Sequence, residues 1–281
     1  MSRRTASAVA QGLRAVLAGS LLALFVLPIL ALLLYPSLGR LLTEAGDPGV
    51  DAALAFTLYA SGLALVLVLL LGIPLGHLLA RSRFPGRSIV EAAVALPVVV
   101  PHLIAGLALF LVVGPGTPVG AALTRAGIPV FATIWGVILV MVYVSAPYTV
   151  LASELAFRAV DPRLLEAARS LGATPAVAAR TVALPLALRG IVAGAVLSWA
   201  RAVSEIGGFL ILAYTVYPSG PYTGPVTSPL SVYIYTVFQI DLADAAAISA
   251  LFVLIAFGLF VAVRLLERFG RLPWPSGELP L

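Results

Sequence analysis

Residues 161–185 read DPRLLEAARSLGATPAVAARTVALP and form a polar interruption between long apolar runs. Asp161 is a candidate N-cap, and Pro162 follows at the first helical position. Gly172 is placed to end that helix, and Thr174, followed by a proline, repeats the start signal. The stretch therefore predicts a helix, a glycine turn and a second short helix.

The first of these helices carries an apolar stripe. Leu164, Ala168 and Leu171 recur at helical spacing, so they share one face. The second helix is predicted to run on towards Leu184 and Pro185. Together the two helices would present an apolar ridge outside the bilayer, as a docking element does.

Composition makes the membrane the solvent of this chain. Of its 281 residues, 61% are hydrophobic and 10% are charged, which is too apolar for a soluble core. All 17 basic residues are Arg, so no phosphate-binding loop of the G-x-x-x-x-G-K type exists. There is no Cys, and the two histidines, His77 and His102, have no nearby acidic cluster, so we expect no metal site. The arginines flank apolar runs, which favours lipid head groups over nucleic acid as their partner.

Six apolar runs reach the roughly 20 residues that a bilayer crossing needs. We place the spans at about 14–35, 54–79, 90–113, 131–152, 186–213 and 243–264. We interpret the first as a retained anchor, because its apolar stretch is long and no cleavage pattern closes it. The chain is thus predicted to be one all-α, polytopic transmembrane domain over residues 1–281.

The arginines fix the predicted orientation. With the N-terminus inside, 14 of the 17 arginines fall on cytoplasmic segments. Arg40 and Arg125 fall outside, and Arg201 lies within a span. This asymmetry predicts cytoplasmic termini and a cytoplasmic loop at 153–185.

Prolines predict irregular backbone in two further segments. The outer loop 214–242 contains four prolines and five tyrosines, which predicts a semi-rigid surface loop. Its tyrosines suit either an aromatic belt at the membrane surface or the docking of a partner protein. In the third span, Pro97 and Pro101 predict a kink or an unwound first half, either as part of a pathway or as a packing kink, with His102 hydrogen-bonded beside it.

The fifth span contains an ionisable pair. Arg201 and Glu205 are spaced i, i+4, so they share a helical face and can pair. Such a pair inside a membrane indicates a functional site by default, although a purely structural pair is the alternative. Gly207 and Gly208 could serve as a hinge near an outer gate or simply allow close helix packing.

The interruption also resembles a known signature. Glu166-Ala167-Ala168, three residues, Gly172, nine residues and Val182-x-Leu184-Pro185 resemble the E-A-A-x3-G-x9-I-x-L-P pattern of ABC importer permeases, with Val in place of Ile. The resemblance implies the type I permease fold, six transmembrane helices with a cytoplasmic coupling helix between the fourth and the fifth. It also implies that this element seats on an ATPase subunit. The predicted ATPase-coupling residues are Glu166, Ala167, Ala168, Leu171, Gly172, Leu184 and Pro185.

Further similarity covers most of residues 56–265 and points to permeases for molybdate, tungstate and sulfate. It rests on LGIPLG at 71–76, on LPVVVPH at 96–102 and on SWARAVSEIGG at 198–208. His102, where many bacterial members have a second Pro, resembles the archaeal tungstate and molybdate branch. The residues predicted to line a pathway or gate are Arg201, Ser204, Glu205, Gly207, Gly208, Pro97, Pro101 and His102.

The resemblance implies a non-catalytic subunit of an ATP-driven importer of a tetrahedral oxyanion. Its partners would be a second permease copy, two ABC ATPase subunits that bind ATP and Mg²⁺, and an extracytoplasmic oxyanion-binding protein. This chain itself would bind no cofactor. A sulfate or other small-solute permease is the alternative. An ion-coupled secondary transporter would show internal repeats, and an intramembrane protease would need a base for Ser204, which the sequence does not provide.

Overall fold

The structure is a computed structural model that describes the backbone of residues 3–269 and the side chains of residues 11–258 and 261. Within that range helices dominate, and β structure is limited to two isolated bridges in the 214–229 segment. The helices are α1 Arg3–Leu34, α2 Leu38–Glu44, α3 Pro48–Arg81, α4 Arg87–Val99, α5 His102–Val113, α6 Pro118–Arg125, α7 Ile134–Ala159, α8 Pro162–Ser170, α9 Pro175–Ala178, the π-helical turn η1 Ala179–Ala183, α10 Leu184–Val203, α11 Gly207–Leu212, α12 Leu230–Phe238 and α13 Leu242–Phe269.

The chain divides into two compact units. The terminal unit comprises residues 1–50 and 234–281, and the central unit comprises residues 51–233. In the terminal unit, Arg40 on α2 pairs with Asp241 at 3.0 Å and with Asp244 on α13 at 2.6 Å. Hydrogen bonds from the backbone N–H groups of Asp244 and Ala243, joined by the Arg40 guanidinium, lower the pKa of Asp241.

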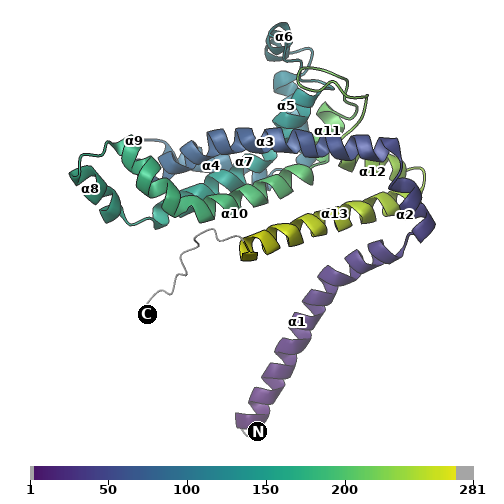
Figure 1. The fold of residues 1–281 in the computed structure, drawn as a ribbon, viewed down its shortest axis with the longest axis horizontal. Helices are drawn as coiled ribbons and strands as arrows, with labels where there is room; N and C mark the ends of the chain where they lie inside the picture. Colours follow the sequence, from purple (N-terminus) through teal and green to yellow (C-terminus); the bar gives the residue numbers. More distant parts are fainter. Residues whose placement is uncertain (1–2, 270–281) are drawn as a thin grey trace. The chain divides into compact units, whose positions relative to one another are not determined.

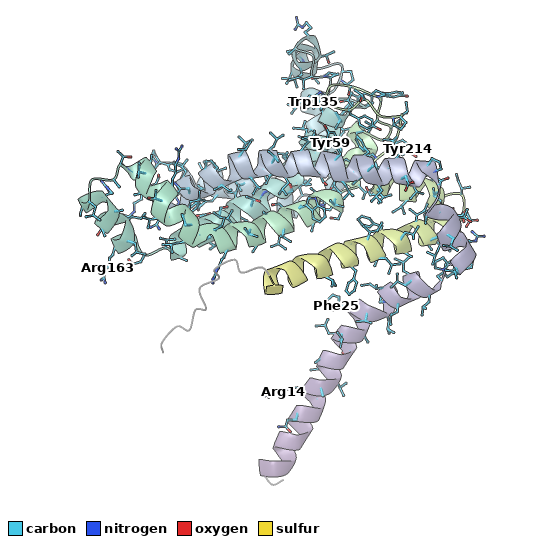
Figure 2. The ribbon with its side chains drawn as sticks, viewed as in Figure 1. Arg14, Phe25, Tyr59, Trp135, Arg163 and Tyr214 are labelled. Atoms are coloured by element: carbon cyan, nitrogen blue, oxygen red, sulfur yellow. The ribbon has the colours of Figure 1, made fainter. Side chains whose placement is uncertain are left out.

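The central unit is built around α7. Figure 1 shows α8 and α9 at one end of this unit and α5, α6 and α11 at the other, with α7 and α10 between them. Figure 2 shows the same separation, with Arg163 extending from one end and Tyr59 and Trp135 near the other. The main core comprises Phe56, Val137, Met141, Phe209 and Leu212 together with their neighbours. The fold therefore separates a polar helical hairpin from the region where α5 and α11 pack.

Small residues let α3 and α10 approach α7 closely. A Cβ built at Gly76 would lie 2.7 Å from Ser153 Cβ, and one built at Gly194 would lie 2.5 Å from Ala152 Cβ. Helices in a membrane associate through such close backbone contacts, because the hydrophobic effect does not drive them together in lipid and van der Waals packing must do so. The glycines of these spans therefore set the helix spacing within the central unit.

The predicted set of six spans is confirmed only in part. Among the described residues, four helical segments are long and apolar enough to cross a membrane, or five if α4 and α5 count as one bent span. Those four are Gln11–Leu34, Pro48–Arg81, Ile134–Ala159 and Pro175–Val203. In the sixth predicted span, the apolar part with described side chains is the shorter helix Leu242–Gly258. The side chains at 262–264, the end of that span, lie outside the described residues.

The predicted kink in the third span is confirmed, and it is sharp. The axes of α4 and α5 differ by 119°, with Val100 and Pro101 between the two helices. Pro101 stands at the N-cap of α5, where its missing N–H costs nothing. Pro97, in contrast, remains inside α4. Of the two alternatives, a kink and an unwound segment, the structure shows the kink, near the middle of the predicted span.

The single span predicted at 186–213 is wrong at both ends. It begins earlier, because α9, η1 and α10 form one continuous helix from Pro175 to Val203. The π-helical turn widens the backbone just before Pro185, whose ring would clash with a regular preceding turn. The span also ends earlier, because residues 204–206 leave the helix and α11 starts anew at Gly207.

The outer loop predicted at 214–242 is only partly irregular. Its first half contains the bridges Val216–Thr227 and Ser219–Tyr222, but α12 occupies Leu230–Phe238. The four prolines all precede this helix, so they do not interrupt it. The proline count therefore overstated the length of the non-helical segment.

Candidate functional site

The two broken helices meet at a cluster of three ionisable side chains. His102 is the first residue of α5, Arg201 lies in the last turn of α10, and Glu205 lies in the junction before α11. Arg201 Nη2 lies 2.6 Å from Glu205 Oε2 and 2.8 Å from His102 Nε2. The predicted Arg201–Glu205 pair therefore forms, and it is joined by a histidine 99 residues away in the chain.

Glu205 is the buried centre of this cluster. Its side chain is 0% exposed, compared with 13% for Arg201 and 47% for His102. Besides Arg201, it accepts a hydrogen bond from the backbone N–H of Gly208 at 2.8 Å, which caps the start of α11. The Glu205 backbone carbonyl accepts a hydrogen bond from Ser231 Oγ at 2.5 Å. A buried carboxylate needs such pairing, and here it also explains why the helix breaks at this residue.

Glycines bring the two helix starts together. A Cβ built at Gly207 would lie 2.7 Å from both His102 Cβ and Leu103 N, and one built at Gly106 would lie 2.7 Å from Gly208 Cα. Of the two interpretations offered for Gly207 and Gly208, close packing is thus what the geometry supports. This contact places His102 against the junction that carries Glu205.

The other predicted pathway residues lie at different distances from the cluster. Ser204 Oγ donates to the Arg201 carbonyl at 3.1 Å and lies 3.5 Å from Arg201 Nη1. Pro101 precedes His102 at the break, whereas Pro97 lies about one turn earlier within α4. Ser204 and Pro101 therefore belong to the site by contact or position, and Pro97 does not.

The predicted coupling element has the local structure that its sequence indicates. Asp161 Oδ1 caps α8 by accepting from the N–H of Arg163 at 2.9 Å. Gly172 has a φ of +93°, and Ala173 N donates to Ala168 O at 3.1 Å. This is the glycine-terminated helix end expected of such a turn. Thr174 Oγ1 then caps α9 by accepting from Val177 N at 3.3 Å.

The hairpin has an exposed face and an anchored face. Leu171 is 90% exposed and Leu164 is 47% exposed, so the apolar stripe faces outward. Glu166, Ala167, Gly172 and Pro185 are also exposed, whereas Ala168 and Leu184 are half-buried. On the anchored face, Leu165 and Leu184 pack against a cluster of Phe157, Val160, Ala183, Ala187 and Ile191. The hairpin is therefore packed directly against the ends of α7 and α10.

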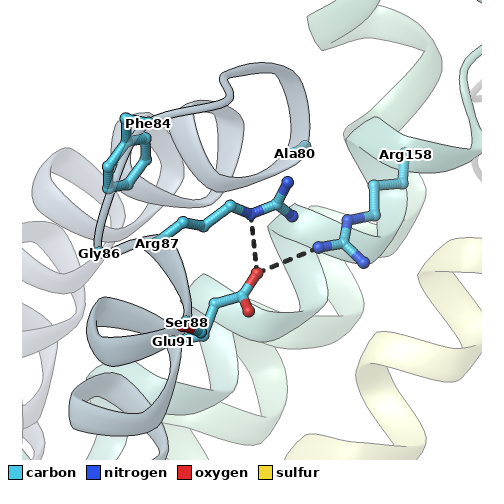
Figure 3. Close-up of a pocket in the computed structure, with 7 residues that line it drawn as sticks. All are labelled: Ala80, Phe84, Gly86, Arg87, Ser88, Glu91 and Arg158. Carbon is cyan, nitrogen blue, oxygen red and sulfur yellow. Dashed lines mark hydrogen bonds and ion pairs between the residues drawn. The ribbon is translucent and has the colours of Figure 1, made fainter.

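Sequence reasoning missed a second charged cluster, which lies at the hairpin end of the central unit. Arg87 on α4 binds Glu91 at 2.9 Å and Glu154 on α7 at 3.3 Å. Arg158 binds Glu91 at 3.2 Å and also contacts Glu154. Figure 3 shows Arg87 and Arg158 converging on Glu91 in an open pocket that Phe84 also lines. The signal that could have revealed it is a pair of acidic residues inside otherwise apolar helices.

At the hairpin end of the central unit, an arginine also links α3 with α7. Arg81 Nη2 donates to the carbonyls of Phe157 at 2.7 Å and of Val160 at 2.8 Å, which satisfies the end of α7. This explains two of the arginines that we assigned to a cytoplasmic loop from charge asymmetry alone. Arg81 and Arg87 both bind the helix that leads into α8.

At the opposite end of the unit, tyrosines order the 214–229 segment. Tyr222 is buried against Phe56, with ring centroids 4.8 Å apart, and its hydroxyl donates to the Pro225 carbonyl at 2.6 Å. Burial raises the pKa of Tyr222. Tyr59 Oη donates to the Pro221 carbonyl at 3.3 Å. Tyr217, in contrast, is 55% exposed and remains available for either a membrane surface or a partner.

Comparison with known proteins identifies the family. Residues 72–271 match the family of the binding-protein-dependent transport system inner membrane component. A probable molybdenum ABC transporter permease protein of Haloferax volcanii is 36% identical over 264 residues, covering 94% of this chain and 92% of the relative. A molybdate/tungstate transport system permease protein of Thermococcus kodakarensis is 36% identical over 135 residues, covering 48% and 49%.

A solved structure shares the fold. It is a chain of a bacterial alginate ABC transporter in complex with an alginate pentasaccharide-bound periplasmic protein. The TM-score is 0.68 at 20% identity, covering 91% of this chain and 93% of the other. The predicted permease fold is thereby confirmed. With the family match extending from the middle of α3 beyond the end of α13, this multi-pass membrane protein belongs to the binding-protein-dependent transport system inner membrane components, the permease subunits of ABC importers.

Proposed function

We propose that this chain is the permease of an ATP-driven importer of molybdate or tungstate. In this proposal an extracytoplasmic binding protein delivers the oxyanion, and alternating access carries it across the cell membrane. Two copies of the chain enclose the pathway, and two ATPase subunits bind on the cytoplasmic side. The similarity to a molybdenum permease along nearly the whole chain supports the substrate class.

The observation that carries the pathway assignment is the charged cluster between two broken helices. Discontinuous helices mark substrate sites in transporters, since irregular backbone at membrane depth is tolerated where it lines a cavity. Arg201 is the cation at this point, and it is held by Glu205, which is 0% exposed. A divalent oxyanion crossing a low-dielectric region requires a compensating positive charge. We therefore assign Arg201 to the pathway.

The exposed face of α8 supports an ATPase contact. Glu166, Ala167 and Leu171 are exposed there, and small residues allow close approach of a partner. Because Leu165 is anchored against the ends of α7 and α10, movement of the hairpin reaches the helix that carries Arg201. We propose that closure of the ATPase dimer drives access change by this route, with both chain termini in the cytoplasm.

The Arg201→Gln variant tests the pathway assignment. The permease is co-reconstituted with its ATPase subunits and binding protein, and ATP-dependent molybdate uptake is measured together with ATP hydrolysis. We expect uptake to fall at least tenfold while hydrolysis continues, because the amide keeps hydrogen-bonding capacity but removes the charge. Unchanged uptake would show that Arg201 only pairs with Glu205. Parallel assays with tungstate and sulfate discriminate the oxyanion.

A further inference from the structure

The hydrogen-bond partners of His102 determine which ring nitrogen is the acceptor. Its Nε2 lies 2.8 Å from Arg201 Nη2. A guanidinium has only donors, so His102 Nε2 must accept. In this arrangement the N–H group of the ring is Nδ1. That Nδ1 faces Glu205 Oε2 at 3.4 Å, where an N–H group is the favourable neighbour of a carboxylate.

The same two contacts determine the orientation of the Arg201 guanidinium. Its Nη2 has two hydrogens, and one is directed to Glu205 Oε2 and the other to His102 Nε2. The Glu205 end is buried, whereas the His102 side chain is 47% exposed. His102 is thus the accessible member of the pair that holds Arg201. An anion approaching from the open side would compete with the imidazole for the same hydrogen.

We propose that His102 is a positioning residue that locks Arg201 onto Glu205 and so withholds its charge from the pathway until the helices move. The inference rests on the proposed pathway role of Arg201. The lock joins α5 to α10, so separating these helices breaks the His102 contact and leaves Arg201 free to bind the oxyanion. Without the lock, anions would pass independently of ATP.

His102→Leu and His102→Gln form a matched pair of tests. Leu has no acceptor, whereas the Gln carbonyl can accept from Arg201 and its amide can donate to Glu205. Both should assemble, because Gly207 packs against the His102 Cβ and backbone, which all variants keep. The permease with its ATPase subunits is reconstituted in vesicles loaded with molybdate, and efflux is measured without ATP.

We expect His102→Leu to raise ATP-independent efflux by roughly tenfold, the factor associated with losing one hydrogen bond to a charged group. His102→Gln should remain close to the parent protein. The double variant His102→Leu, Arg201→Gln should return efflux to the parent level, because the leak needs the freed guanidinium. Equal efflux from the parent and His102→Leu would overturn the proposal. An equal rise of efflux in His102→Leu and His102→Gln would also overturn it.

These results separate the lock from the function on which it rests. If Arg201→Gln retains uptake, the pathway assignment fails whatever His102 does. If Arg201→Gln abolishes uptake and His102→Leu does not leak, only the lock fails. Gel filtration and ATP hydrolysis of each complex identify a variant that has not assembled, and His102→Gln then still tests whether an acceptor suffices.

Discussion

At the scale of single residues, Gly207 is a position where the site has no room for a side chain. A Cβ there would contact the backbone of His102 and Leu103, which cannot yield as a flexible side chain does. We expect Gly207→Ala to destabilise the protein by about 1–3 kcal/mol, the usual cost of overpacking. It should also separate α5 from α11, so ATP-dependent uptake falls together with the thermal midpoint.

Gly62 on α3 provides the control for this substitution. A Cβ at Gly62 would meet nothing within 4 Å, and alanine favours a helix more than glycine does. Gly62→Ala should therefore keep both the thermal midpoint and uptake. If Gly207→Ala behaved in the same way, the close contact between the two helix starts would not constrain the site.

Single residues also show what sequence could and could not predict about the site. The i, i+4 spacing of Arg201 and Glu205 was enough to predict their pairing, because helix geometry is local. The third member, His102, was placed beside the third-span kink, but its contact with Arg201 depends on how two separate helices pack. Local patterns carry no information about such a contact. The same limit hid the contact of Glu154 with Arg87, which lies on another helix.

At the scale of elements, α4 and α7 are linked by charges around a buried carboxylate. The Glu154 side chain is 7% exposed and is bound by Arg87 and Arg158. Removing both cations in the double variant Arg87→Gln, Arg158→Gln would leave this charge uncompensated, at a cost of about 3–5 kcal/mol. We expect a large drop in the thermal midpoint of the purified protein.

Adding Glu154→Gln should recover much of that loss, because no buried charge then remains. Glu91→Gln alone should change stability by less than about 1 kcal/mol, as its carboxylate is 34% exposed. A triple variant no more stable than the double variant would show that the arginines act through packing instead. The comparison thus isolates electrostatics at this helix pair.

Element boundaries were predictable where caps set them and not elsewhere. Asp161, Gly172 and Thr174 act as the sequence indicates, because each cap is a contact within a few residues. The end of α10 was missed, because apolar residues resume directly after Arg201 and Glu205, so the average hydropathy stays high into α11. What breaks the helix there is the Glu205 carboxylate, which caps the next helix at Gly208. A hydropathy window does not detect a cap inside an apolar run.

At the scale of the whole molecule, we expect the exposed face of the hairpin to affect coupling to a partner protein and not the stability of the fold. Glu166 is exposed on α8, so Glu166→Lys should leave stability within about 0.5 kcal/mol. It should instead uncouple the assembled transporter, with ATP hydrolysis continuing while molybdate uptake is lost. Glu166→Gln removes the charge without reversing it, so its molybdate uptake should lie between that of the parent protein and that of Glu166→Lys. Full uptake in the lysine variant would place the ATPase contact elsewhere.

The π-helical turn at Ala179–Ala183 sets the direction in which the hairpin faces. Such a turn contains one residue more than the α-helix that it replaces. Each residue of an α-helix advances the chain by about 100° around the axis. Losing a single residue here would rotate α8 by about that angle around the axis of α10 and turn Leu171 away from its present direction, and it would also press the Pro185 ring against the preceding turn. One inserted residue thus sets the rotation of α8 relative to α10.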